Sequence, residues 1–484
     1  MIQEKTQPKP LFSENYKADS ADLAAGRYGT EEMIKILGAE QTFQKSLEVQ
    51  GQAAIILSEL HPDIVPIECA DELAKKATLE FIDADRIREL EEQEGHDVIA
   101  INTSLEEVVS TEAGTHINKF KTSADTTQPV KALQLKEALE VIIDSTQNLR
   151  DIILEKSMEW IDIPHMDTTH LYDAVPTVAG RPLSHYAEML QSDLEFLSYV
   201  YHNSIIGKWA DATGNHHSAT ALGVDGIKVQ EEYCKRLGIG FMDAPAQVPG
   251  LEFEADIFYA LARLGMTMGN IARYIATGRG DDVNIFVNMG KKKKGSSAMP
   301  HKDAKRGNPT AEEQVMSIAN YLTGNLTTAM MNCQMPYARD LSASSNARIN
   351  VEDGFKYMDH GIRRLAKIIY DLGIKEDRCK ERVLRSKGWS TSQLVTTYLT
   401  DHRKTDKPMA RSDAHDLLGK LATEWDNKTP FVDALLQNEE ITSRLDENTI
   451  MEITDPLKYI GLSKEIVKIV YDKYHKNNIL ETEK

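Results

Sequence analysis

No glycine interrupts the chain between Gly114 and Gly180, so this segment can continue as one regular element over much of its length. Within it, apolar residues recur mostly every three or four positions, as on one face of an α-helix. These residues are Leu133, Leu135, Leu139, Ile142, Ile143, Leu149, Ile152 and Ile153. The pattern predicts a helix from roughly Val130 to Trp160, about 45 Å long at about 1.5 Å per residue. A small compact domain cannot cover such a helix, so the sequence predicts a bundle and other subunits.

Two further segments carry the same periodicity. From Phe253 to Ile275 apolar residues again fall on one helical face. A third long helix is predicted to open at Thr310, directly after Asn308 and Pro309, because proline is favoured in the first helical turn.

The regions on either side of these helices contain shorter helical pieces, broken by "HPDIVP" and "EQEGHD" in one and by "KGWSTSQ" and "NKTP" in the other. We therefore expect an all-α fold with three helical domains. The expected domains are residues 1–120, a central long-helix bundle over 121–376, and residues 377–484. Short apolar alternations leave a β-hairpin possible.

The charge of the chain limits its partners. Its 484 residues carry a formal net charge of −19, which repels a polyanion, so we expect no nucleic acid partner. A small anionic ligand would need local positive charge, for which the run from Lys291 to Lys294 is one candidate.

The cysteines suggest a reducing compartment. Cys69, Cys234, Cys333 and Cys379 are scattered, with no CxxC pair and no histidine or carboxylate cluster at zinc spacing. The N-terminus has no apolar signal region, and no run of about 18 apolar residues occurs. We expect a cytoplasmic protein with no membrane partner and no structural metal.

The segment from Gly295 to Pro309, "GSSAMPHKDAKRGNP", carries the strongest chemical signal. Glycine allows a tight turn, and the small side chains leave backbone N–H groups free to hold an oxyanion. A serine hydroxyl on such a loop can act as a nucleophile beside a histidine, or as a base if the amides and Lys302 lower its pKa. A flexible surface linker is the alternative. A triad hydrolase is disfavoured, because the chain lacks GxSxG and a convincing parallel sheet.

This loop resembles the signature loop of the fumarase/aspartase superfamily, whose members mostly release fumarate from a succinyl-type substrate. Other segments resemble the adenylosuccinate lyase family within it, in order along nearly the whole chain. They are "GRYGTEEM" (26–33), "GHDVIA" (95–100), "TSAD" (122–125), "TTHLYDAVPTVAG" (168–180), "RDLSASSNAR" (339–348) and "PFVDALLQNEEITSRLDENTI" (430–450).

The resemblance implies which residues act. Ser296 is expected to be the base and His170 the acid, with Lys302 meeting the developing charge and His96 as a further catalytic residue. The expected substrate-binding residues are Arg27, Tyr28, Asp97, Thr122, Ser123, Thr169, Gln247, Ser297, Met299, Asn308, Arg339, Ser344 and Arg348. The resemblance also implies a central long-helix bundle of the fumarase/aspartase type, a homotetramer with shared active sites, and no cofactor. Its substrates would be adenylosuccinate, giving AMP and fumarate, and the succinyl-aminoimidazole carboxamide ribotide of purine biosynthesis.

Two departures from the family pattern bear on specificity. Five residues, "DAKRG" (303–307), separate Lys302 from Asn308 where the family has one. Tyr172 and Asp173 stand where relatives commonly carry Gln-Pro.

Two other functions remain open. One is another fumarate-releasing lyase, such as an argininosuccinate lyase, and the other is a non-catalytic relative that binds nucleotide. Arg27→Ala distinguishes an adenylosuccinate lyase from an argininosuccinate lyase. Only the nucleotide lyase should lose substrate affinity, because only its substrate has a phosphate for that arginine to bind.

Overall fold

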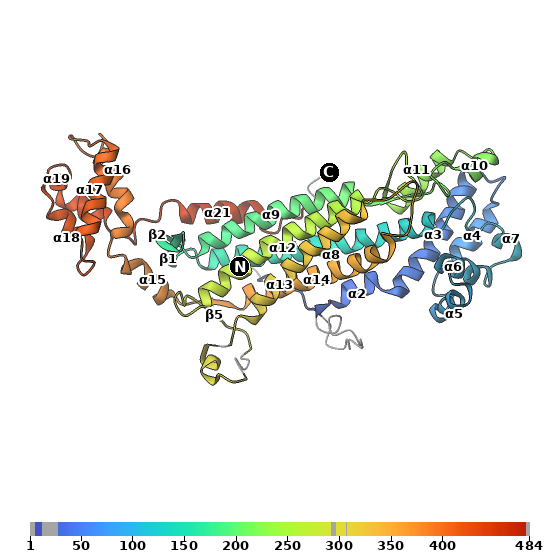
Figure 1. Ribbon diagram of the computed structural model, residues 1–484, viewed down its shortest axis with the longest axis horizontal. Coiled ribbons are helices and arrows are strands. Elements are labelled where there is room, and N and C mark those ends of the chain that lie inside the picture. Colours follow the sequence, from blue (N-terminus) through green and yellow to red (C-terminus); the bar gives the residue numbers. More distant parts are fainter. Residues whose placement is uncertain (1–4, 12–27, 292–296, 306, 481–484) are drawn as a thin grey trace.

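The computed structural model describes residues 5–11, 28–291, 297–305 and 307–480. Five long helices form its centre and lie side by side in Figure 1. They are α8 (Ala124–Glu159), α9 (Gly180–Asn203), α12 (Glu252–Arg279), α13 (Thr310–Asn332) and α14 (Ser344–Tyr370). The all-α expectation is confirmed.

The three long helices predicted from periodicity are α8, α12 and α13. The first begins at Ala124, earlier than the expected Val130, and includes Pro129. Asp125 lies in its first turn, and Oδ2 of this residue accepts the backbone N–H of Thr122, just before the helix, at 2.8 Å. Ile142, Ile143, Leu149 and Ile153 of this helix are fully buried.

Smaller helices occupy the two ends of the elongated molecule (Figure 1). At one end lie α3 (Ala39–Leu60), α4 (Ile67–Lys76), α5 (Ala84–Glu94), α6 (Asp97–Glu106), α7 (Thr111–Gly114), α10 (His217–Ala221) and α11 (Gly226–Leu237). Helix α2 (Glu31–Leu37) precedes them and packs beside α8 and α14. At the other lie α15 (Glu376–Arg385), α16 (Ser392–Thr400), α17 (Arg411–Glu424), α18 (Phe431–Leu436) and α19 (Glu439–Thr442), followed by α20 (Glu447–Ile453). Helix α21 (Ser463–Tyr474) returns along α9.

Two hydrophobic cores underlie this arrangement. The larger joins the bundle to the N-terminal helices and also takes in Cys379 of α15 and Val470 of α21. The smaller is confined to 395–453 and is built around residues such as Phe431 and Leu435. The predicted domain boundaries stay a prediction.

Strands are few and short. The longest pair is an antiparallel hairpin of β1 (Pro164–Thr169) and β2 (Tyr172–Val178), which realises the hairpin that the sequence left open. The others are β3 (Ile206–Gly207) with β4 (Gly240–Phe241), and β5 (Phe286–Asn288) with β6 (Leu372–Ile374). Among the described residues, no helix is both long and apolar enough to cross a bilayer.

Candidate active site

Several predicted residues meet where α6, α8 and α14 begin. His96 is the N-cap of α6, Ser123 immediately precedes α8, and Ser344 is the first residue of α14. Each helix directs the positive end of its dipole toward its N-terminus, so these starts favour a bound anion.

The side chain of His96 contacts that of Ser123, with Nε2 and Oγ 3.2 Å apart. Nδ1 of His96 lies 3.2 Å from the backbone nitrogen of Val98 and 3.2 Å from Asp97 Oδ1. When Nε2 carries the ring proton, it donates to Ser123 Oγ, which leaves the serine hydroxyl hydrogen free to donate to a ligand oxygen. This pair can therefore orient an anionic group.

Two arginines approach the same place. Arg348 Nη2 lies 3.7 Å from Asp97 Oδ2, and Arg339 Nη1 donates to Gln247 Oε1 at 3.3 Å. Burial, with Arg348 nearby, lowers the pKa of Arg339, although its charge remains. Among the described residues, Asp97 is the only carboxylate that forms an ion pair with either arginine, so their remaining N–H groups can donate to a ligand.

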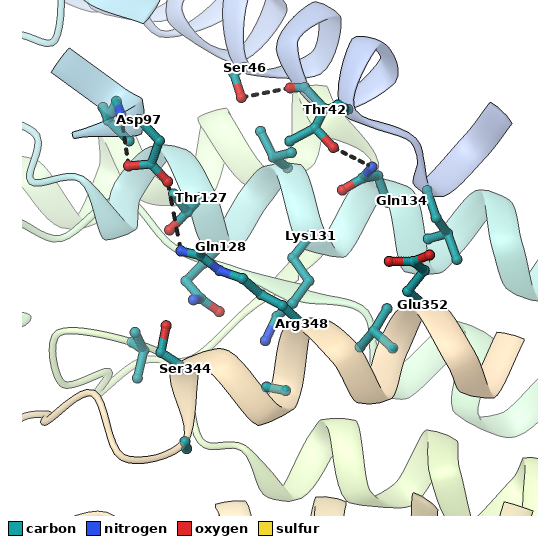
Figure 2. A pocket seen from close by; sticks show the side chains of 18 of the residues that line it. Thr42, Ser46, Asp97, Thr127, Gln128, Lys131, Gln134, Ser344, Arg348 and Glu352 are labelled. Atoms are coloured by element: carbon teal, nitrogen blue, oxygen red, sulfur yellow. Dashed lines mark hydrogen bonds and ion pairs between the residues drawn. The ribbon is translucent and has the colours of Figure 1, made fainter. Parts of the chain in front are cut away.

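A cavity of about 440 Å³ opens between these groups. Figure 2 shows Arg348 reaching from α14 to Asp97, with Lys131 and Gln134 extending from α8. The predicted residues that line it are Asp97, Arg339, Ser344 and Arg348. Sequence reasoning missed Thr127, Lys131 and Gln134, although their spacing places them on one helical face. Lys131 donates to Glu254 at 2.6 Å, which offsets its charge.

A buried ion pair between Asp125 and Lys208, the ionic hub, supports the backbone of Thr122 and Ser123. The side chains of Asp125 and Lys208 are both 0% exposed and form an ion pair. Asp125 also accepts the backbone N–H groups of Thr122 (2.8 Å), Ala210 (2.8 Å) and Asp211 (3.1 Å). The hub therefore fixes the backbone that carries the predicted substrate-binding Thr-Ser pair.

Lys121, next to this hub, supplies a prediction about pH and stability. It is buried and donates to Gln50 Oε1 at 2.9 Å, and burial lowers its pKa to about 7 from 10.5, with Asp125 partly opposing the shift. Between these values the unfolded chain binds more protons than the folded chain, so stability rises with pH across that window. We expect urea denaturation to show the free energy of unfolding of the wild type rising, relative to Lys121→Met, by up to a few kcal/mol between about pH 7 and pH 10.

Lys235, whose side chain is 75% exposed, supplies the matched control. Lys235→Met should follow the wild type across this range. Parallel curves for the wild type and Lys121→Met would contradict the prediction.

The predicted acid lies elsewhere. Thr169 ends β1, and His170 and Leu171 form the two-residue turn of the β1–β2 hairpin. Both turn residues have positive φ, 52° and 68°, as two-residue hairpin turns with right-handed twist require. The hairpin tip is exposed and follows α8, whose 36 residues span about 54 Å from Ser123. Within one chain, the length of α8 therefore separates His170 from the cavity.

The described part of the signature loop, residues 297–305, lies apart from the bundle (Figure 1). Ser297 and Met299 are exposed and Lys302 is half-buried beside a 3₁₀ turn, η1 (Pro300–Lys305). Asn308 is half-buried just before α13, and the carbonyl of Gly307 accepts from Arg279 Nη2 at 3.1 Å. Ser296 and Arg27 lie outside the described residues.

Tyr28 forms a further separate group. Its ring packs edge-on against His360 of α14, with centroids 5.6 Å apart. Burial lowers the pKa of His360 to about 4, so the ring is neutral at physiological pH. Arg364, one helical turn further on, has a buried Nε that finds no hydrogen-bond partner among the described residues. Sequence reasoning missed this arginine, since nothing local distinguishes it from Arg363, which pairs with Asp359.

No three His, Cys, Asp or Glu side chains in the described ranges group closely enough to hold a metal ion. The structure thus gathers His96, Asp97, Thr122, Ser123, Gln247, Arg339, Ser344 and Arg348 at one end of the bundle. It does not bring the hairpin residues Thr169 and His170 to that cluster.

Known proteins resemble this chain over most of its length. It is 28% identical over 444 residues to an adenylosuccinate lyase of Methanocaldococcus jannaschii, covering 91% of this chain and 93% of the relative. It is 29% identical over 442 residues to an adenylosuccinate lyase of Streptococcus mutans, covering 91% and 98%. A family model described as adenylosuccinate lyase C-terminus matches residues 392–470.

Solved structures share the fold. A fumarate lyase from Mesorhizobium sp. BNC1 superposes with a TM-score of 0.79 at 19% identity, covering 92% of this chain and 99% of the other. A 3-carboxy-cis,cis-muconate lactonizing enzyme from Pseudomonas putida gives 0.78 at 18% identity, covering 93% and 98%. The family model described as lyase matches residues 26–324, more than half of the sequence. The chain therefore belongs to this lyase family, within the fumarase/aspartase superfamily.

Proposed function

We propose that this protein is an adenylosuccinate lyase, which eliminates fumarate from adenylosuccinate to give AMP and from the succinyl-aminoimidazole carboxamide ribotide. The similarity to adenylosuccinate lyases over more than nine-tenths of the chain carries this proposal. The match of residues 392–470 to the adenylosuccinate lyase C-terminus supports it over argininosuccinate lyase.

The reaction removes a proton from carbon beside a carboxylate and expels the substrate nitrogen. Such a proton is weakly acidic, because the intermediate gathers two negative charges on one carboxylate. Fixed cations and donors that meet this charge lower the barrier most. In our proposal Ser296 takes the proton, and Lys302, Thr169 and the loop amides stabilise the charge.

His170 then delivers a proton to the departing nitrogen. The electron pair of the broken C–H bond forms the fumarate double bond, and the C–N pair leaves with the nitrogen. No redox partner or metal is needed, so we propose that the enzyme works without a cofactor.

The cavity is the proposed nucleotide site. Arg339 and Arg348 offer planar donors for phosphate or carboxylate, and Ser344 lies at the dipole end of α14. Ser123, oriented by His96, is placed to donate to a substrate carboxylate. Arg27 and Tyr28 would complete the phosphate site from another chain.

We propose that each site is shared between subunits of a homotetramer. The separation of the hairpin from the cavity by the length of α8 supports this, since a neighbouring antiparallel bundle can bring one chain's hairpin to another's cavity. Exposed apolar side chains on the long helices also favour association, among them Tyr199, Tyr259, Met266, Tyr321, Met330 and Ile349. Each chain would be a reduced, cytoplasmic protein divided at about residues 120 and 376.

The first test is fumarate release by the purified protein from adenylosuccinate, with argininosuccinate run beside it. Release from adenylosuccinate alone is the expected result. Release from argininosuccinate alone would move the protein to that branch, and tight nucleotide binding without turnover would identify a non-catalytic relative.

Arg348 supplies a sharper prediction about the cavity. Arg348→Ala removes a charge-assisted hydrogen bond worth about 1.5–3 kcal/mol, so KM for adenylosuccinate should rise about 10- to 100-fold. Arg348→Lys keeps the charge but loses the planar pair of donors, so its KM should lie between those of the wild type and Arg348→Ala. Arg403→Ala is the control, because Arg403 is exposed and pairs with Asp401 in the smaller core's region. An unchanged KM for Arg348→Ala would remove this residue from the nucleotide site.

A further inference from the structure

The hairpin tip that carries Thr169 and His170 has few contacts of its own. Leu171 is 96% exposed and Tyr172 is 79% exposed. Within the described residues, the side chains of 169–172 take part in no hydrogen bond or ion pair. Backbone pairing of Thr169 with Tyr172 therefore closes the turn without fixing its direction.

Asp173 is the residue that ties this tip to the rest of the chain. It lies opposite Thr168, beside the turn. Its Oδ1 accepts from Arg382 Nη2 at 2.8 Å, and its Oδ2 accepts from Arg385 Nη2 at 2.6 Å. Helix α15 therefore holds both carboxylate oxygens. This helix begins at Glu376, more than 200 positions after Asp173 in the sequence.

The two arginines differ in burial. Arg382 has a side chain only 9% exposed, so its guanidinium depends on Asp173 for an opposite charge. Arg385, three residues later on the same helical face, is 54% exposed. His165 lies near Arg382 and Asp173, and burial lowers its pKa to about 4, so it adds no charge there at physiological pH. Among the described residues, Asp173 therefore forms ion pairs with the two arginines alone.

The backbone pairing of β1 with β2 is interrupted between the base of the hairpin and its tip. The register between β1 and β2 shifts between Met166 and Thr168, which leaves Ala174 and Val175 outside regular pairing. A bulge bends a hairpin and changes the aim of its end. Below the bulge the hairpin is buried at Met166 and Thr177, whereas residues 167–173 are exposed. The clamp of Asp173, Arg382 and Arg385 spans this break.

We propose that this clamp aims the hairpin tip, so that Asp173 is a positioning residue for His170 and Thr169. The inference rests on the proposed role of His170 as proton donor. It also explains what Asp173, which stands outside the family pattern, does in this chain, because its carboxylate forms the ionic tie between the hairpin and α15. A general acid loses efficiency steeply when it is displaced, so loosening the clamp should slow turnover more than it weakens nucleotide binding.

The test compares variants of the full-length protein in steady-state kinetics with adenylosuccinate. Asp173→Asn should lower kcat about 10- to 100-fold while KM changes less than about threefold. Arg385→Ala, at an exposed pair, should have a smaller effect in the same direction. Asp173→Glu, which keeps the charge, should recover part of kcat. Lys380→Ala is the control, because no hydrogen bond or ion pair among the described residues joins this exposed cation of α15 to the hairpin, and its kcat should equal that of the wild type.

A merely structural role predicts a different result: less folded protein, but an unchanged kcat and pH profile per folded site. Unchanged kcat for folded Asp173→Asn would overturn the proposal. If Asp173→Asn does not fold, the Arg385→Ala variant tests the proposal instead. A kcat and pH profile equal to those of the wild type in Arg385→Ala would then overturn it.

Hydrogen–deuterium exchange separates this inference from the proposed reaction. Peptides spanning 164–178 should exchange faster in Asp173→Asn and Arg385→Ala than in the wild type or Lys380→Ala. If the wild type releases no fumarate, the proposed function fails, and faster exchange would still support the clamp. Unchanged exchange in both variants would overturn the clamp whatever the activity.

Discussion

Replacing His170 with alanine is expected to lower kcat for fumarate release by about 10²- to 10⁴-fold, the contribution of a positioned general acid. The variant should still fold, because His170 is an exposed turn residue whose side chain makes no hydrogen bond within the described chain. Its positive φ of 52° adds only a small strain when alanine replaces it. KM should change little, since the role assigned to His170 appears only after the substrate is bound.

The measurement is kcat at saturating adenylosuccinate, with nucleotide binding measured separately by calorimetry. His402→Ala is the matched control, because this histidine is 84% exposed in the C-terminal part of the chain. A kcat within about threefold of the wild type would exclude His170 as the acid. Ser296→Ala should give a loss of similar size, as expected for the base.

The long helices were predictable because their signal is local. Ile142, Leu149 and Ile153 recur with helical spacing, and all three are fully buried in the bundle. The start of α8 was placed too late, because contacts of its first turn are not local. Asp125 of this turn pairs with the buried Lys208, which lies 83 positions away in the sequence.

The hairpin was harder to predict for a physical reason. Its turn uses His170 and Leu171, both with positive φ, where Asn-Gly or Asp-Gly is the usual signal. What anchors it, the contact of Asp173 with Arg382, joins residues 209 positions apart. A single sequence contains no information on such a pairing. The family pattern marked Asp173 as a departure, whereas only the structure gives it partners.

The residues of the candidate site likewise divide into those that motifs predicted and those that only the structure revealed. His96, Asp97 and Ser123 were found from motifs, and the structure brings them together at one end of the bundle. The motifs could not reveal that His170 lies at the other end of α8, because order along the sequence does not specify distance in space. Residues such as Lys131 and Arg364 belong to no motif and were found only through the cavity and the missing partners around them.

Mixing two inactive variants is expected to restore activity. His96 belongs to the cavity cluster and His170 to the hairpin, and α8 separates the two within one chain. If each site combines one chain's cavity with another chain's hairpin, a mixture of His96→Ala and His170→Ala chains forms some sites with both histidines intact. Fumarate release should then exceed that of either variant alone by at least about 10-fold, because a native site outperforms one that lacks its acid by about 10²-fold or more.

The control uses two variants from the same cluster. His96 and Arg348 both belong to the cavity cluster of a single chain, joined through Asp97. Chains carrying His96→Ala and Arg348→Ala therefore cannot form a site with both residues intact, and their mixture should stay at the level of its components. Differently tagged chains, refolded together and purified through both tags, establish that subunits have exchanged. Recovery in the first mixture but not in the second would locate each active site between subunits. If verified mixed oligomers of the first pair remained inactive, one chain would have to supply both histidines to a site, and α8 would have to bend or break for them to meet.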